Sequence, residues 1–130
     1  MGNTGHGFSL FELLIVLVII GILAKISYPI YTHALIKTHR IEAKIALINL
    51  AQRMEIYYLS NNNSYEDATF NKLHLKDITE KNFYDLAVKS TANTYLLSAK
   101  AKFSDPECYL FMLNQLGKKT NAGSGSNLCW

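Results

Sequence analysis

The chain has 130 residues, of which 13 are Lys or Arg and 10 are Asp or Glu, so its formal net charge is only +3. This length allows one small domain plus one additional rod, and so weak a charge balance does not by itself require a nucleic-acid partner. The chain has no internal repeat and no phosphate-loop, dinucleotide-binding or catalytic-nucleophile motif, so we predict a protein that is not an enzyme and holds no cofactor.

The first predicted element is an apolar helix that begins at residue 8. From Phe8 to Ala24 only Ser9 and Glu12 carry polar side chains. Such a helix is about 26 Å long, close to the minimum that crosses the hydrocarbon core of a bilayer. A soluble core helix of this kind would need a larger protein around it, and a secretory signal would end in small residues, whereas this run ends at Lys25. The run therefore predicts membrane insertion.

Glu12 is the residue of this run that points to a function. A carboxylate inside an apolar segment costs roughly 3 kcal/mol on insertion scales, so an intramembrane acid is functional by default. The alternative is an ordinary acid at a helix start, stabilised by the helix dipole. If the chain were cut between Gly7 and Phe8, Glu12 would lie one helical turn after a new α-amine.

The segment from Gly7 to Glu12 reads Gly-Phe-Ser-Leu-Phe-Glu, and it resembles the processing motif of type IV pilins, usually written G-F-T-L-I-E. The resemblance implies cleavage after Gly7 by a prepilin peptidase, N-methylation of Phe8 and a role for Glu12 in filament assembly. It also implies an inner-membrane assembly platform and other pilins, major and minor, as partners. The departures are two mild substitutions inside the motif and a leader, residues 1–7, that has no Lys or Arg.

Gly21 and Pro29 also sit where this family has its helix-weakening glycine and proline. A proline inside a helix removes one backbone hydrogen bond, here to the carbonyl of Lys25, and Gly21 adds backbone freedom. We therefore expect a kink, or a segment able to unwind, between them. Lys25 itself stands where such pilins tend to have a small residue, and we interpret it as an interface lysine that snorkels toward the headgroups.

The pattern from residue 31 to residue 60 is helical and amphipathic, with two apolar faces. One stripe, predicted to hold a sheet of the same chain, consists of Ala43, Leu47, Leu50, Met54, Tyr57 and Tyr58. The other side, which can face neighbouring subunits, carries Ile41, Ile45, Ile48 and Leu59. Turn residues at 60–64 end the helix, and 61–81 is predicted to be a loop with one helical turn at most.

Two blocks extend the resemblance to the PilE-like minor pilins, over about half of the chain. The first lies within residues 42–58, and the second is Asn-Asn-Asn-Ser-Tyr at 61–65. The ending of the chain, from Leu113-Asn114-Gln115 to Cys129-Trp130, also looks like that of these pilins.

The remainder predicts an antiparallel meander within residues 82–120. Strands are expected at 83–88, at 95–103 and at 108–114, with 116–120 closing the last one. The second of them alternates cleanly, which places one face on the Leu47 stripe. Residues 121–127 form a Gly/Ser-rich loop.

Cys108 and Cys129 are the only cysteines, and in a translocated chain they should pair. The disulfide would close a C-terminal loop, 108–129, and stabilise the fold by roughly 3 kcal/mol in the chain-entropy model. In terms of the resemblance, this is the C-terminal disulfide loop of pilins. The basic residues that follow the apolar run would by the positive-inside rule stay cytoplasmic, but the cysteines and the motif favour the opposite side.

The histidines His6, His33, His39 and His74 have no metal-binding spacing, and an approach of Asp77, Glu80 and Asp85 would be a solvated acidic face, so no metal site is predicted. The expected fold class is α+β: a type IV pilin fold with a long helix over about 8–60 and a small sheet packed on its C-terminal half. The expected organisation is a leader at 1–7, a transmembrane and assembly helix at 8–30 and a globular domain at 31–130.

The predicted function is that of a structural, minor subunit of a type IV pilus, inserted in the bacterial inner membrane as a single-pass prepilin and then assembled into an extracellular filament. Such filaments serve adhesion, twitching motility or DNA uptake. Two alternatives stay open: a type II secretion pseudopilin, and a pilin that binds DNA or a surface through Lys118, Lys119 and nearby tyrosines.

Overall fold

The computed structural model describes residues 2, 5, 7–125 and 128–130. The chain divides into two compact units, Met1–Leu35 and Ile36–Trp130. Helix α1 (Leu10–Ser60) runs through both, and the second unit also holds strands β1 (Tyr84–Ser90), β2 (Tyr95–Ala101), β3 (Leu110–Asn114) and β4 (Lys119–Ala122). The α+β class and the long helix predicted from the sequence are confirmed, with the helix beginning at Leu10 rather than at residue 8.

In the first unit, α1 is an apolar helix without a packing partner from the described chain. The Ser9 side chain caps its start, because the Glu12 N–H donates to Ser9 Oγ at 3.1 Å. All the buried residues of α1 lie beyond Leu35. The most apolar 18-residue window of the helix has a mean hydropathy of 2.5, which is enough by length and composition to cross a membrane.

The helix continues through Gly21 and Pro29 without a break in its assignment. The turn around the proline is supported by side chains that bond to backbone carbonyls. Thr32 Oγ1 donates to the Pro29 carbonyl at 2.9 Å, and Ser27 Oγ donates to the Leu23 carbonyl at 2.8 Å. The kink or unwinding expected between Gly21 and Pro29 therefore stays a prediction.

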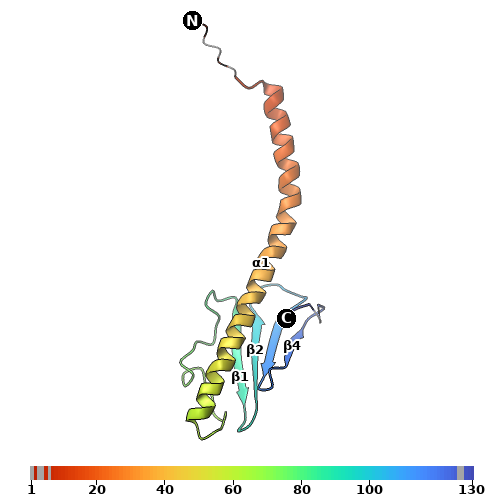
Figure 1. Ribbon diagram of the computed structural model, residues 1–130. Coiled ribbons are helices and arrows are strands. Elements are labelled where there is room, and N and C mark those ends of the chain that lie inside the picture. The colour runs from red at the N-terminus through yellow and green to blue at the C-terminus, as the bar shows by residue number, and fades with distance from the viewer. Residues whose placement is uncertain (1, 3–4, 6, 126–127) are drawn as a thin grey trace. The chain divides into compact units, whose positions relative to one another are not determined.

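In the second unit, the C-terminal part of α1 lies along one face of the sheet (Figure 1). Its buried stripe consists of Ala43, Leu47, Leu50 and Met54, each 0% exposed. This stripe packs in one core with the inward side chains of the strands, among them Tyr84, Leu97 and Phe111. The side of the helix that carries Ile41, Ile45, Ile48 and Leu59 is exposed.

The sheet is a meander of order β1-β2-β3-β4, with all neighbours antiparallel. Its last strand differs from the prediction. The sequence at 119–122 is polar and was expected to pass into a loop at Asn121, yet Asn121 pairs with Phe111 and Ala122 with Leu110. Strand pairing needs only backbone groups, so a polar segment can join the edge of a sheet when a neighbouring strand holds it in place.

The connection between α1 and β1 is a loop, as predicted. Asn62 and Asn63 adopt the left-handed backbone, with φ of 53° and 57°, and the Asn63 N–H donates to the Tyr58 carbonyl at 3.0 Å. Asparagine tolerates this conformation better than most residues, so it ends the helix here. The loop forms turns and one isolated bridge between Ile78 and Asp85. It also holds the one helical turn expected from the sequence, because the Leu73 N–H donates to the Thr69 carbonyl at 2.9 Å, four residues earlier.

Candidate functional site

The processing motif lies at the start of the first unit, in a non-helical segment. Gly7 and Phe8 precede α1, and Phe8 is 80% exposed. The peptide bond between them is therefore outside the helical hydrogen-bond pattern, where a protease can reach it. Glu12 lies in the first turn of α1 and is exposed. Only part of the leader, residues 2, 5 and 7, lies within the described residues, and His6 lies outside them.

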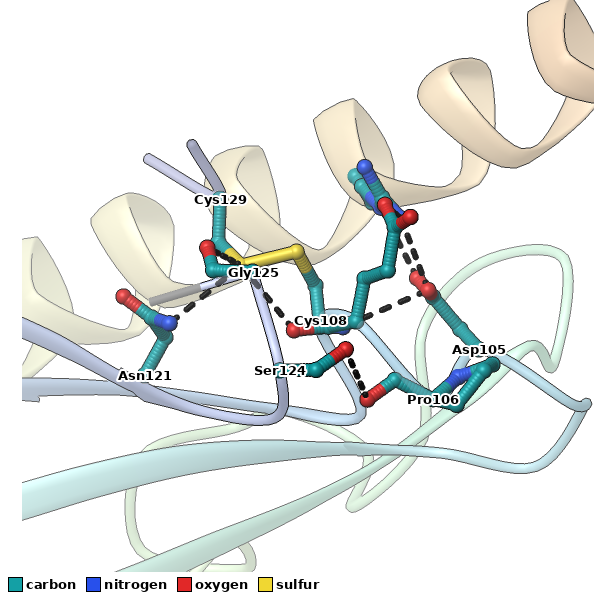
Figure 2. Close-up of polar contacts among 9 residues, drawn as sticks. Asp105, Pro106, Cys108, Asn121, Ser124, Gly125 and Cys129 are labelled. Atoms are coloured by element: carbon teal, nitrogen blue, oxygen red, sulfur yellow. Dashed lines mark hydrogen bonds and ion pairs between the residues drawn. A yellow bond between two sulfur atoms is a disulfide. The ribbon is translucent and has the colours of Figure 1, made fainter. Parts of the chain in front are cut away.

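The second candidate region is the end of the chain, where the predicted disulfide is present. Cys108 and Cys129 are joined with their Cα atoms 5.7 Å apart, and both are buried. Figure 2 shows how the chain between them returns to the segment that precedes Cys108. The Ser124 N–H donates to the Pro106 carbonyl at 3.1 Å, and the Gly125 N–H donates to the Glu107 carbonyl at 3.0 Å.

This return requires a glycine at one position. Gly123 has a φ of +136°, in a region that side chains rarely allow, and a Cβ atom there would collide with the carbonyl oxygen of Glu107. The close approach of two backbones thus explains part of the Gly/Ser-rich composition of the segment.

A bidentate ion pair fastens the same region to α1. Arg40 Nε donates to Asp105 Oδ2 at 2.8 Å, and Arg40 Nη2 donates to Asp105 Oδ1 at 2.7 Å (Figure 2). The Asp105 residue is 3% exposed. Hydrogen bonding to Arg40 lowers the pKa of the Asp105 carboxyl, and the same contact raises the pKa of the Arg40 guanidinium. Arg40 Nη2 also lies 3.4 Å from the exposed Glu107 carboxylate, so one cation serves two acids.

Two cations and an aromatic ring lie near this ion pair: Lys44, Lys119 and Trp130. Together with the exposed sequence neighbour Lys118 we call them the basic patch. Lys44 comes from α1, and Lys119 begins β4. Burial lowers the pKa of the Lys44 ammonium, and repulsion from Arg40 and Lys119 lowers it further, so these cations are close enough to act on one another. When an anion binds between such cations, their electrostatic repulsion is reduced, and this reduction favours anion binding.

An aromatic ring completes the basic patch. The Lys119 ammonium lies 5.4 Å from the centre of the Trp130 ring, within cation–π range. Trp130 Nε1 donates to the Thr120 carbonyl at 2.8 Å, and its ring meets Phe111 edge to face at 5.6 Å. The ring is therefore held rigidly at the border of the core, with part of its surface exposed.

The structure brings together residues that sequence reasoning left apart. Lys118 and Lys119 were singled out with nearby tyrosines, but the aromatic neighbour of Lys119 is Trp130. Lys44 belongs to the basic residues that follow the apolar run, and its distance along the sequence gives no sign that it approaches Lys119. Nothing in the sequence connects Arg40 with Asp105, 65 positions away.

The other polar residues considered do not form a site. Asp85 lies 3.3 Å from the Lys102 ammonium, so it belongs to an ion pair rather than to an acidic cluster. His39 packs its ring on Phe83, with centroids 3.8 Å apart. Within the described part of the chain, no group of three or more His, Cys, Asp or Glu side chains could hold a metal ion.

Three features together define a type IV pilin. They are a helix that is apolar at its start and amphipathic later, a meander sheet packed on the amphipathic part, and a C-terminal disulfide. The family model described as type IV minor pilin ComP, DNA uptake sequence receptor, matches residues 29–112, which is more than half of the chain. The chain belongs to this family, and it is a minor subunit of the type IV pilus. A second model, the prokaryotic N-terminal methylation motif, matches residues 3–24.

One solved structure similar to this chain is the crystal structure of the non-core minor pilin PilV of Neisseria meningitidis. The two are 22% identical with a TM-score of 0.48, and the match covers 66% of this chain and 88% of that one. No curated protein matches the chain significantly. The resemblance to minor type IV pilins is confirmed by the family models, and a pilus subunit is favoured over the pseudopilin alternative. The family is one of structural pilins, in accord with the prediction that the chain is not an enzyme.

Proposed function

We propose that this minor pilin binds DNA at the surface of a type IV pilus, and that the basic patch is the contact surface. The observation that carries the proposal is the Lys119 ammonium 5.4 Å from the centre of the partly exposed Trp130 ring, in a chain whose family is described as a DNA uptake sequence receptor. Lys44 is near enough for repulsion from Lys119 to contribute to its lowered pKa. A phosphate that neutralises these cations relieves their repulsion and releases counterions from the nucleic acid.

The arrangement of the basic patch suits a nucleic-acid backbone better than a small anion. Lys118 and Lys119 are exposed at the start of β4, and Lys44 reaches the same patch from α1. Cations supplied by separate elements can contact separate phosphates. Arg40 contributes indirectly, because it neutralises Asp105 and offsets Glu107, whose negative charges would otherwise repel DNA.

The proposal includes the route by which the subunit reaches the filament. The apolar start of α1 inserts into the inner membrane, a prepilin peptidase cuts after Gly7 on the cytoplasmic side, and Phe8 is methylated. Glu12 then sets the axial register of the helix against other pilins, because a wrong stagger would leave its carboxylate unpaired in an apolar environment. The globular domain, 31–130, ends outside the cell.

Binding to a labelled DNA duplex, measured with the full chain in detergent at several salt concentrations, tests the DNA-binding surface. Replacing Lys119 by Gln should weaken binding several-fold, and it should reduce the slope of log affinity against log salt by about 0.9, because one phosphate contact is lost. Lys118→Gln should act in the same direction.

Lys89→Gln is the matched control. Lys89 is equally exposed, but it lies on β1, at the opposite edge of the sheet from β4. Equal losses of affinity and slope in Lys89→Gln and Lys119→Gln would show that net charge alone drives binding, and the basic patch would lose its role.

A further inference from the structure

Lys25 is the only Lys or Arg of the first unit, and none of the described side chains pairs with it. It is exposed on a helix whose neighbouring positions are apolar and equally exposed, with Leu23 at 58% and Ile26 at 57%. The apolar run before it, from Phe8, measures about 26 Å along the helix axis, against about 30 Å for a hydrocarbon core. The ammonium therefore falls at the far boundary of the bilayer when Phe8 lies at the near one.

Two tyrosines continue the polar boundary that Lys25 begins. Tyr28 is 73% exposed and Tyr31 is 63% exposed. Residues three apart are neighbours on a helix surface, so Lys25 and Tyr28 lie next to each other, and Tyr28 and Tyr31 do likewise. With about 1.5 Å of rise per residue, the three side chains start within about 9 Å along the axis. The polar layer of one leaflet is roughly 5–8 Å thick, so Lys25 lies at its inner border and Tyr31 near its outer border.

From this geometry we infer that Lys25, Tyr28 and Tyr31 form a lipid-headgroup anchor, which fixes how deeply the subunit sits in the bilayer before assembly. The ligand is the phosphate and ester layer of phospholipids at the outer interface. The Lys25 ammonium bonds to lipid phosphate. The two tyrosines start about 4.5 and 9 Å further out along the axis, so their rings lie in the ester and headgroup layer, where their hydroxyl groups can hydrogen-bond.

The sequence beyond Lys25 shows why a charged residue at this position limits how deeply the helix can insert. Without its ammonium, the helix would present no further charged side chain until Lys37, twelve residues later, and only Ser27, Thr32 and His33 would be polar besides the tyrosines. A stretch that long exceeds the hydrocarbon thickness, so the helix would be free to sink or to tilt. Lys25 removes this freedom and thereby sets one depth.

The other possible partner of Lys25 is the carboxylate of a neighbouring helix. Within residues 1–35 the only acidic side chain is Glu12. Pairing of Lys25 with Glu12 of another copy would require a stagger of 13 residues, about 20 Å along the axis. Two copies held at the same depth in one bilayer cannot adopt that stagger, which favours the lipid.

The test is a measurement of helix depth with the full chain in vesicles of phosphatidylethanolamine and phosphatidylglycerol. Ile30 is 65% exposed and lies between the two tyrosines, so Ile30→Cys serves as the reporter for a membrane-impermeant maleimide. The native cysteines are paired and do not react. An Asn62→Cys reporter, in the loop after α1, measures the fraction of chains that face outward.

With labelling normalised to the Asn62→Cys reporter, Lys25→Ala should slow the reaction at the Ile30→Cys reporter at least threefold, because the helix sinks. Lys25→Arg should react at the rate of the unchanged chain, and Tyr28→Leu should give a smaller decrease. Glu12→Gln, which removes the acidic partner of any pairing between helices, should not reproduce the decrease seen in Lys25→Ala.

Two results would overturn the inference. Equal labelling in Lys25→Ala and in the unchanged chain would show that Lys25 does not set the depth. The second result is a labelling rate in Glu12→Gln that falls as far as in Lys25→Ala and recovers when the protein is diluted in lipid. That result would assign Lys25 to pairing between helices instead.

Discussion

Helix α1 contains two stretches that look alike in backbone and differ in where their partners lie. Between Leu10 and Leu35 its residues are exposed or half-buried, whereas between residue 36 and Ser60 a stripe of four residues is fully buried by the sheet of the same chain. Both stretches are rich in Leu and Ile. The first stretch is apolar all round, and the second is apolar on two faces, of which one is covered.

Hydrophobicity alone therefore does not determine which surface a helix packs against. A helix that is apolar all round must be buried by something larger than itself. None of the residues that the structure describes covers this stretch, so a bilayer or other pilins must do so. The exposed isoleucines of the second stretch, Ile41, Ile45 and Ile48, likewise form an apolar face that the sheet does not cover. The following changes separate contacts made within the chain from contacts made outside it, in order of decreasing effect on stability.

Arg40→Gln should have the largest effect, because it leaves the buried Asp105 carboxylate without its cation. Removing one partner of a buried pair costs about 3–5 kcal/mol. Thermal unfolding of the full chain in detergent at pH 7 would measure this loss. Because the folded chain lowers the pKa of Asp105 from its ordinary 3.8, the pair stabilises above that pH and its contribution disappears as the pH falls below it.

The difference between Arg40→Gln and the unchanged chain should therefore shrink toward low pH. A constant difference down to pH 2 would contradict the assignment of the loss to Asp105.

Leu47→Ala and Ile45→Ala form a matched pair on the two sides of the second stretch. Leu47 is 0% exposed in the core, and its truncation should cost about 2–5 kcal/mol. Ile45 is 55% exposed, and its truncation should change stability by about 0.5 kcal/mol at most. Denaturant unfolding measures both. Equal costs would mean that the Ile45 side is also packed within the chain.

Cys129→Ser should lower stability by about 3 kcal/mol, because the loop of 21 residues after Cys108 is no longer closed in the unfolded chain. Thermal unfolding with and without reductant measures the same quantity twice, since reduction of the unchanged chain should lower stability to the level of the variant. Alkylation of both cysteines without reductant, in protein that has crossed the membrane, would contradict the disulfide and the predicted topology together.

Glu12→Ala should change the stability of the second unit little, by about 1 kcal/mol at most through the helix dipole, while reducing incorporation into filaments severely. The variant, co-expressed with unchanged chain, should still be inserted, processed and oxidised. Counting variant subunits in sheared filaments measures the effect, with Glu66→Ala, at an exposed site of the second unit, as the control. Normal incorporation of Glu12→Ala would leave it an ordinary helix-start acid.

The sequence by itself determined the elements and the class of the protein. The apolar run, the change to an amphipathic pattern and the alternation in β2 are local periodicities, and each follows from side-chain polarity along one element. The buried stripe from Ala43 to Met54 was readable for the same reason. The processing motif at Gly7 and Phe8 is local too, so family and membrane insertion could be predicted without a fold.

Only the tertiary structure decided the candidate surface. Three contacts join segments that are separated in the sequence. They are the Arg40–Asp105 ion pair, the close approach of Gly123 to Glu107, and the basic patch formed by Lys44, Lys119 and Trp130. The position of β4 was decided in the same way, because a polar edge strand is specified by the backbone of β3 rather than by its own side chains. Charge and close packing depend on distances in space, and periodicity along the chain does not contain those distances.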